Sequence, residues 1–270
     1  MAEKKFFVER YKKLGWEFSE PKIKQAIRVN TQKISKEKLK KRLSELGVKA
    51  TYVEFTKDGL FIEKTHFSIG SAVEYLLGYY YIQEASAQTA AELLNLTDKD
   101  VVLDCCAAPG GKTTQISQLM KNKGVVVALD KKSQRLIALK NNIERMGCKN
   151  VIVYNLDALN VSSLGIKFDK ILLDAPCSGN FTQQDDWFDR RDLDGIRGNA
   201  ENQRKLLKAC YDVLKPGGTL VYATCSLEPE ENEENISWFS KNFKVKLVTQ
   251  KRFWPSQENR GFFTAKLVKK

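Results

Sequence analysis

The chain has 270 residues, of which 42% are hydrophobic and 29% charged, and it carries a net charge of +12. This length suits one large α/β domain with a smaller appendage, and it is enough to bury a full core. No apolar run reaches the ~18 residues of a membrane span, and the opening residues lack the apolar stretch of a secretory signal, so we expect a cytoplasmic protein with no membrane partner.

The cysteines argue against a metal site. Six are scattered through apolar segments, and only one histidine is present. Their spacing matches no set of paired ligands, so we predict reduced thiols and no metal. A thiol redox protein would need C-x-x-C, whereas Cys105 and Cys106 are adjacent. Because neighbouring side chains of a strand point to opposite faces, we expect one core thiol and one loop thiol there.

The positive charge is concentrated at the two ends. Residues 1–50 contain 15 Lys and Arg against 6 Asp and Glu, residues 244–270 contain 8 against 1, and the remainder is net acidic. A basic end is often only a solvated surface, but a field confined to two regions indicates a polyanionic partner. Aromatic rings in the segment KRFWPSQENRGFF favour a nucleic acid, because such rings stack on exposed bases.

The first part of the chain is predicted to form a small α+β unit, residues 1–75. Helical periodicity over residues 3–14 places four apolar side chains on one side: Phe6, Phe7, Tyr11 and Leu14. A strand, a helix and a hairpin-like pair follow, at residues 26–30, 35–46, and 50–56 with 60–62.

Residues 76–270 are predicted to form the second domain, in which strands and helices alternate. The predicted helices are 84–94, 112–121, 132–146, 200–214 and 230–241, and the predicted strands are 101–105, 125–130, 151–154, 169–173, 218–223, 244–249 and 262–268. Alternation requires a parallel sheet with crossover helices. Only a loop separates the last two strands, so they should pair antiparallel at one edge, which is the Rossmann-like methyltransferase fold with a seven-stranded sheet.

The segment VVLDCCAAPGGKTTQIS predicts a ligand site. A strand ends at Asp104, a loop with Gly110 and Gly111 follows, and a helix begins near Lys112. Glycines let the backbone approach a ligand, and the first N–H groups of the helix point at it. A P-loop would need glycine where Cys106 stands, and the pattern G-x-G-x-x-G is absent, so neither ATP nor a dinucleotide fits.

Acidic residues at the strand ends suggest an adenosine-type cofactor. Asp130 ends the next strand, 19 residues past Gly111, where a Rossmann-like fold places the acid that binds a ribose. Asp157 follows the third strand and could reach an adenine amino group. S-adenosylmethionine fits this arrangement because it needs no phosphate cradle.

The segment ILLDAPCSGN places an acid and a thiol at the carboxyl end of another strand, because Pro176 prevents the strand from continuing. Ligands bind at this edge of open α/β sheets. Cys225 follows the next strand in the same way. A free cysteine is often only a small buried apolar side chain, so the residues alone leave the role of Cys177 open.

Together, the motifs LDCCAAPGGKT, ALDKKSQRL, LDAPCSG and YATCSLEPEENE, with RVNT, QEASAQ and GFFTAKL, resemble the RNA 5-methylcytosine methyltransferase family of the Nop2/Sun type. The resemblance covers residues 26 to 268 and is greatest to the archaeal tRNA members. It implies that Cys225 attacks C6 of cytosine, that Cys177 helps release the product, and that Asp174 contacts the base. The implied cofactor residues are Cys106, Ala107, Ala108, Pro109, Gly110, Gly111, Lys112, Asp130, Arg135, Asp157 and Asp174.

The same resemblance places Lys112 near the catalytic centre and assigns RNA contacts to Arg28 and Asn30. It implies an RNA partner, with tRNA favoured and rRNA as the alternative. No long exposed apolar stripe stands out, so we expect a monomer. One departure is clear: Phe181 stands where the family pattern has a second glycine, so the loop 179–199 is expected to have its own conformation and its own part in holding RNA.

Two other functions are weighed against this one. An amino-group methyltransferase needs no thiol and usually presents Asn/Asp-Pro-Pro-aromatic after the fourth strand, where this chain has Asp-Ala-Pro-Cys. A basic RNA-binding or assembly factor could keep the fold without the chemistry. The intact set of Asp174, Cys177 and Cys225 argues against it, because a thiol next to an acid suits nucleophilic addition to a cytosine ring.

Overall fold

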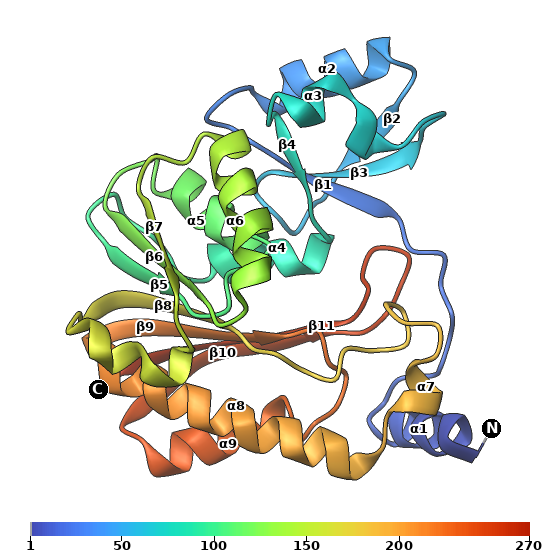
Figure 1. The fold of residues 1–270 in the computed structure, drawn as a ribbon. Coiled ribbons are helices and arrows are strands. Elements are labelled where there is room, and N and C mark those ends of the chain that lie inside the picture. Colours follow the sequence, from blue (N-terminus) through green and yellow to red (C-terminus); the bar gives the residue numbers. More distant parts are fainter. Residues whose placement is uncertain (1) are drawn as a thin grey trace.

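A computed structural model describes residues 2–270 (Figure 1). A seven-stranded sheet forms the body of the molecule, and a four-stranded sheet forms a smaller unit, at the top of Figure 1. Within the described residues, no helix combines the length and the apolar character needed to cross a membrane.

The smaller unit is an antiparallel sheet in the order β2-β3-β1-β4. Its strands are β1 (Gln25–Val29), β2 (Lys49–Tyr52), β3 (Gly59–Lys64) and β4 (Tyr80–Ile82). The predicted helix is α2 (Lys36–Glu45), which Ser35 caps by accepting a hydrogen bond from the Lys38 amide. Its buried Leu39 and Leu43 pack on the sheet.

One strand of this sheet was not predicted. β4 has only three residues, which is too short for an alternating pattern to stand out. It pairs antiparallel with β1, so the sheet takes a strand from beyond residue 75. Two short helical turns precede it, η1 (Ile69–Ser71) and α3 (Val73–Leu76).

The large sheet has the order β10-β11-β9-β8-β5-β6-β7. Its strands are β5 (Val101–Asp104), β6 (Val125–Asp130), β7 (Val151–Asn155), β8 (Phe168–Asp174), β9 (Leu214–Thr224), β10 (Val245–Phe253) and β11 (Phe262–Lys269). The strands from β9 to β7 run parallel, and β11 is antiparallel to both β9 and β10. The predicted mostly parallel sheet with an antiparallel edge is confirmed.

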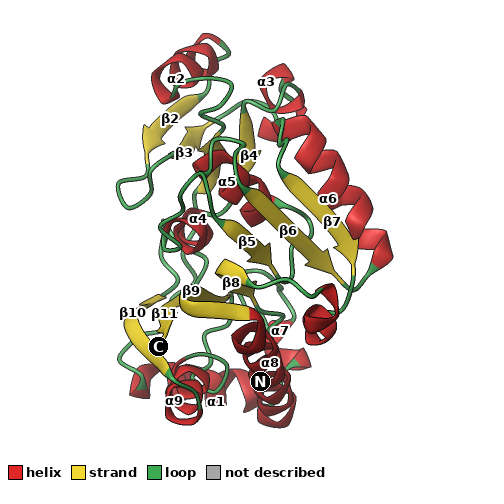
Figure 2. Cartoon of the chain, turned by 90° about the vertical axis from the view of Figure 1, so that its left-hand side faces the viewer, coloured by secondary structure: helices red, strands yellow, loops and turns green. Residues whose placement is uncertain are grey.

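Helices cover both faces of this sheet (Figures 1 and 2). One face carries α4 (Ala85–Glu92), α5 (Gly111–Leu119) and α6 (Ser133–Met146). The other carries η2 (Ala158–Leu164), α8 (Leu193–Val213) and α9 (Glu233–Asn242). Successive side chains of a strand point to opposite faces of the sheet, so one strand contributes to the apolar core on each face. In β5, Val102 packs with Ile116 of α5, and Leu103 packs with Leu207 of α8.

Helix α8 begins seven residues earlier than the predicted 200–214. Asp192 caps it by accepting a hydrogen bond from the Gly195 amide, 2.7 Å away. The first two turns contain Gly195 and Gly198 and one buried apolar side chain, Ile196, so they show little helical periodicity in the sequence.

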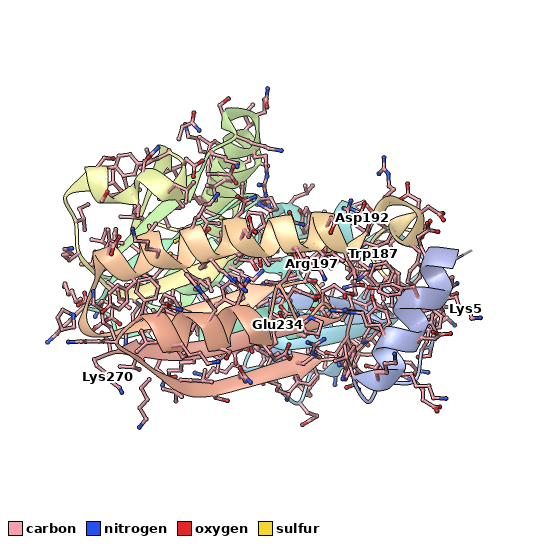
Figure 3. All side chains as sticks on the ribbon, turned by 90° about the horizontal axis from the view of Figure 1, so that it is seen from below. Lys5, Trp187, Asp192, Arg197, Glu234 and Lys270 are labelled. Atoms are coloured by element: carbon pink, nitrogen blue, oxygen red, sulfur yellow. The ribbon has the colours of Figure 1, made fainter. Side chains whose placement is uncertain are left out.

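Helix α1 (Ala2–Lys13) forms as predicted, but its buried face is narrower. Phe7 and Tyr11 are buried, whereas Phe6 and Leu14 are 44% and 38% exposed. The sequence groups this helix with the small N-terminal unit, but the structure packs it against α7 (Trp187–Arg190), beside the large domain (Figures 1 and 3). An aromatic cluster joins the two helices, with Phe7 4.8 Å from the Trp187 ring.

Candidate active site

The two strand-end cysteines meet at the carboxyl edge of the sheet. Cys177 follows β8 and Cys225 follows β9, and these neighbouring parallel strands place Asp174 opposite Ala223. The two Sγ atoms are 3.1 Å apart, and both cysteines are free thiols. The topology therefore brings two thiols into direct contact.

This contact makes the two thiols unequal. The hydrogen bond from Cys177 lowers the pKa of Cys225, against the opposing effects of burial and of the Asp174 charge. The same hydrogen bond, together with burial, raises the pKa of Cys177. Cys225 is therefore the thiol that is more easily ionised, and Cys177 is the one that keeps its proton.

Lys112 and Asp174 form an ion pair beside the thiols. Lys112 Nζ lies 2.7 Å from Asp174 Oδ2 and donates a hydrogen bond to it. Burial would lower the pKa of Lys112, but the neighbouring Asp174 carboxylate outweighs burial, and the pKa is raised. Lys112 therefore stays a cation in the first turn of α5.

A cavity of about 320 Å³ opens over these groups. Seven of the predicted site residues line it: Cys106, Ala108, Lys112, Arg135, Asp174, Cys177 and Cys225. Glu84, Gln183, Gly261 and Phe262 lie in the same wall. Across residues 2–270 no group of three or more His, Cys, Asp or Glu side chains is placed to hold a metal ion.

The remaining predicted cofactor residues lie outside the lining of this cavity: Ala107, Pro109, Gly110, Gly111, Asp130 and Asp157. Gly110 caps α5 with a φ of +109°, a conformation that glycine adopts without strain. A side chain at Gly111 would meet the Tyr81 ring at 3.2 Å. These two glycines let the loop pass close to β4 and begin the helix.

The residues present fit an adenosine cofactor. Asp130 is 3% exposed, and its Oδ1 accepts a hydrogen bond from the Lys132 amide. Its Oδ2 is buried and accepts no hydrogen bond. The Arg135 Nη1 atom lies 3.0 Å from this oxygen and forms an ion pair with it, but the geometry is not that of a hydrogen bond. A buried acceptor without a donor is suited to a ribose hydroxyl.

Asp157 has a local partner in this structure. Its side chain caps η2 by accepting a hydrogen bond from the Leu159 amide at 3.0 Å, and it is half-buried. A contact between Asp157 and adenine stays a prediction.

A further acid, Asp104, is fully buried at the end of β5, next to the loop that leads to α5. Thr113 Oγ1 donates to its Oδ2 at 2.7 Å, and its Oδ1 accepts no hydrogen bond. Burial raises the pKa of Asp104 to about 7. The sequence marks this residue as a strand-end acid, but its complete burial could not be read from the motif.

The structure places Arg28 and Asn30 differently from the prediction of RNA contacts. Arg28 is fully buried and donates to Gly111 O at 2.6 Å, to Thr114 Oγ1 at 2.8 Å and to Gln83. Asn30 is 1% exposed and donates to the carbonyls of Gly78 and Met146. Both side chains bind protein at the junction of the two units, and we therefore propose no RNA contact for them.

The loop 179–199 supplies residues that the motifs did not reveal. Asn180 is buried and donates to the backbone oxygen of Cys225 at 2.8 Å. Gln183 lines the cavity, and its side chain helps to lower the pKa of Cys225. Phe181 packs in the aromatic cluster with Tyr11 and Phe188, which explains why a ring stands where the family has glycine. In the sequence, the only sign of these contacts was the replacement of the family's second glycine by Phe181.

The adjacent cysteines divide as predicted. Cys105 is 1% exposed, with its Sγ 3.3 Å from that of Cys210, and it belongs to the core. Cys106 lines the cavity.

Comparison with known proteins gives the family. Residues 91–268 match the family described as 16S rRNA methyltransferase RsmB/F, and residues 4–85 match the N-terminal domain of 16S rRNA methyltransferase RsmF. A tRNA (cytosine(72)-C(5))-methyltransferase of Pyrococcus horikoshii is 41% identical over 71% of this chain and 53% of its own length. A ribosomal RNA small subunit methyltransferase F of Vibrio parahaemolyticus is 40% identical over 82% of this chain and 48% of its own length. The chain thus spans about half the length of the curated relatives it matches.

Solved structures show the same fold. A methyltransferase homologue from Pyrococcus horikoshii has a TM-score of 0.85 at 40% identity, over 92% of this chain and 87% of that chain. NSun6 from the same organism, solved with SFG, also has a TM-score of 0.85, at 29% identity over 93% of this chain and 91% of that chain. As the motifs predicted, the chain belongs to the RsmB/F (NOL1/NOP2/Sun) family of S-adenosylmethionine-dependent RNA cytosine-5 methyltransferases.

Proposed function

We propose that this chain methylates C5 of a cytosine in RNA, through a covalent bond between Cys225 and C6 of the base. The observation that carries the proposal is the contact of two unequal thiols at 3.1 Å, in one cavity with Asp174 and Lys112. A methyltransferase that acts on an amino group has no use for such a pair.

The reaction needs a nucleophile because C5 of cytosine is too weakly nucleophilic to take a methyl group. The Cys225 thiolate forms a bond to C6, and the electron pair displaced from the C5–C6 double bond makes C5 enamine-like. Asp174 lines the same cavity as Cys225, where it would meet N3 and the amino group of the base and stabilise the protonated ring. Lys112 holds the Asp174 carboxylate in place.

Release of the product reverses the addition. A base removes the C5 proton, the electron pair re-forms the C5–C6 double bond, and the bond between Cys225 Sγ and C6 breaks. The departing sulfur carries negative charge. The Cys177 S–H group, within hydrogen-bond distance of that sulfur, stabilises it as it leaves.

We propose that the strand-end acids and the loop after β5 hold the methyl donor. When bound, S-adenosylmethionine supplies the methyl group. Asp130 would hold its ribose, and the loop from Cys106 to Lys112, with Arg135, would enclose it. Asp157 is proposed for the adenine.

We favour tRNA as the substrate, since a relative that is 41% identical is named for cytosine 72 of tRNA. Ribosomal RNA is a second candidate, because relatives of about 40% identity are named for the small ribosomal subunit. The test uses labelled S-adenosylmethionine with separate unmodified pools of tRNA and 16S rRNA, followed by nucleoside analysis for 5-methylcytosine. If labelled 5-methylcytosine appears in one of the two RNA pools, the proposal is supported and that RNA is identified as the substrate. RNA binding without transfer to either pool would indicate a non-catalytic RNA-binding factor.

A further inference from the structure

Each catalytic cysteine is followed by a buried serine. Ser178 and Ser226 are 1% and 0% exposed, and their hydroxyl oxygens lie 3.1 Å apart. The loops after β8 and β9 therefore touch twice, once through the sulfurs of Cys177 and Cys225 and once through the serine hydroxyls of the next residues.

One carboxylate lies against this second contact. Glu231 is fully buried, and Ser178 donates to it from both its backbone and its side chain, at 3.0 Å from N to Oε1 and 2.5 Å from Oγ to Oε2. Gln203 of α8 donates to Glu231 Oε1 at 3.0 Å and to Pro176 O at 2.9 Å. Three protein donors thus satisfy a charge that would otherwise be costly to bury.

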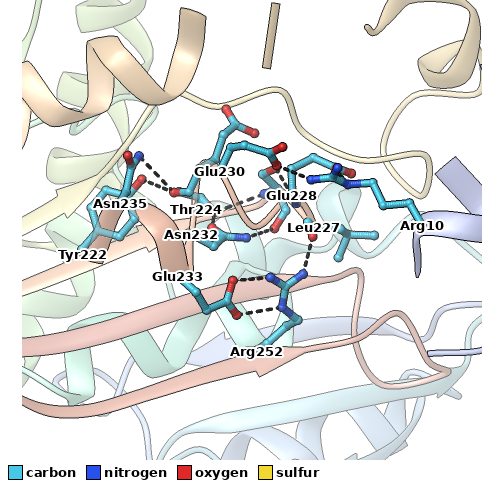
Figure 4. A network of polar contacts seen from close by, with 12 residues as sticks. Arg10, Tyr222, Thr224, Leu227, Glu228, Glu230, Asn232, Glu233, Asn235 and Arg252 are labelled. Carbon is cyan, nitrogen blue, oxygen red and sulfur yellow. Dashed lines mark hydrogen bonds and ion pairs between the residues drawn. The ribbon is translucent and has the colours of Figure 1, made fainter. Parts of the chain in front are cut away.

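Glu231 is itself rigidly held. Its backbone oxygen accepts a hydrogen bond from Tyr222 OH, and the next residue, Asn232, accepts one from Thr224 Oγ1 (Figure 4). Arg252 binds both the Leu227 carbonyl and the Glu233 carboxylate in the same segment (Figure 4). The carboxylate is thereby fixed relative to the end of strand β9, which Cys225 directly follows.

We propose that Glu231 is a positioning residue for the reaction, which fixes the contact between Cys177 and Cys225 by holding Ser178 against Ser226. The proposal rests on the function proposed above. It adds a residue that makes no hydrogen bond to either cysteine and lies outside the lining of the active-site cavity.

The negative charge of Glu231, like its hydrogen bonds, favours the state in which Cys177 is protonated and Cys225 is ionised. The contact with Cys225 and burial raise the pKa of Cys177, and the nearby Glu231 charge raises it further. Asp174 and Lys112 are the charged groups that face Cys225 directly. With Glu231 anionic, the proton stays on Cys177 and the negative charge on Cys225.

The test is Glu231→Gln, which keeps the shape but removes the charge and turns one oxygen into a donor. Rates of alkylation of Cys225 and Cys177 by iodoacetamide are measured separately by peptide mass spectrometry, on folded protein without RNA or cofactor. Loosening the serine contact and removing the charge both move the thiolate from Cys225 toward Cys177. We expect the ratio of the Cys225 rate to the Cys177 rate to fall about tenfold, the change that one pKa unit produces.

Ser178→Ala provides a milder variant, since it removes one hydroxyl and leaves the backbone hydrogen bond to Glu231. Its ratio should fall in the same direction by a smaller factor. Glu234→Gln is the matched control, because it makes the same chemical change on an exposed residue three positions away (Figure 3), and its ratio should equal that of the wild type.

Turnover supplies the second readout. In Glu231→Gln, kcat for RNA methylation should fall while KM for RNA stays unchanged. A wild-type alkylation ratio in Glu231→Gln, or an equal change in Glu234→Gln, would overturn the inference. The alkylation ratio needs no RNA, so it still decides the role of Glu231 if the wild type proves to methylate no RNA.

Discussion

Lys112 Nζ lies 2.7 Å from Asp174 Oδ2 and 5.2 Å from the centre of the Phe262 ring. The lysine comes from the first turn of α5 and the acid from the end of β8. This ion pair connects the loop proposed to hold the cofactor with the acid proposed to contact cytosine, so each is oriented by the other.

The ion pair predicts a large effect of Lys112→Met on catalysis. Methionine keeps most of the volume but leaves Asp174 without its donor, so the acid is no longer held toward the base. We expect kcat to fall by roughly a hundredfold, the range in which single positioned acid–base groups act. Lys112→Arg should restore little activity, because a planar guanidinium is not interchangeable with an ammonium group. Single-turnover methylation rates measure both variants, and wild-type rates would contradict the assignment.

The buried contacts of Arg28 predict a coupling between the small unit and the loop proposed to hold the cofactor. Arg28→Met removes one donor from each of three oxygens inside the protein: Gly111 O, Thr114 Oγ1 and Gln83 Oε1. We expect a loss of roughly 2–5 kcal/mol in the free energy of unfolding and weaker binding of S-adenosylmethionine. Denaturant titration and calorimetry measure the two effects.

Arg197→Met is the control for Arg28, since the Arg197 side chain is 62% exposed and pairs at 3.5 Å with Asp194, whose side chain is 95% exposed. Exposed ion pairs contribute less than about 1 kcal/mol, so this variant should be close to the wild type. Equal losses in the two variants would show that the buried contacts of Arg28 do not couple the units.

Asp104 predicts a specific pH dependence of stability. Burial raises its pKa to about 7 in the folded protein, from an ordinary value of 3.8. Between these two pH values the folded state holds a proton that the unfolded state has released. The contribution of Asp104 to stability therefore falls as the pH rises from about 4 to about 7.

Asp104→Asn removes this titration and keeps an oxygen to accept the Thr113 hydrogen bond. The variant should gain stability relative to the wild type between pH 5 and pH 8, by roughly 2–4 kcal/mol. Denaturant titrations of both proteins at the two pH values provide the measurement. A difference that is the same at both pH values would mean that Asp104 does not titrate in this range.

Tyr11 predicts that helix α1 stabilises the segment after Cys225. Its hydroxyl donates to the buried Glu228 Oε1 at 2.9 Å, three residues beyond Cys225. Tyr11→Phe should reduce the free energy of unfolding by roughly 1–3 kcal/mol, because Glu228 loses a donor. Tyr52→Phe is the control, since Tyr52 is 39% exposed, and thermal unfolding compares the two. Equal melting temperatures would show that this contact adds nothing.

The large sheet and the two thiols could be predicted from the sequence because each depends on a local pattern. Apolar strands such as residues 169–173 end at a proline, and the order of strands and helices fixes which ends become neighbours. The contact of Cys177 with Cys225 follows from that topology. Motif positions therefore identified seven residues of the cavity wall.

The remaining features depend on tertiary contacts that no local pattern encodes. The family resemblance assigns an RNA contact to Arg28, but the fold buries its side chain between two units, with hydrogen bonds to residues 83, 111 and 114. The sequence of helix α1 reveals its helical periodicity, but it does not reveal that Trp187, far along the chain, packs against its apolar face. The same holds for Glu231, whose partner Ser178 lies 53 residues away.

The covalent adduct tests the central claim most directly. Wild type, Cys177→Ala and Cys225→Ala are each incubated with S-adenosylmethionine and the RNA chosen by the methylation assay, and denaturing gels are run to detect protein bound to RNA. We expect Cys177→Ala to accumulate the adduct, because the departing Cys225 sulfur lacks its hydrogen-bond donor, and Cys225→Ala to form neither adduct nor 5-methylcytosine. Methylation by Cys225→Ala, or an adduct formed without Cys225, would contradict the account.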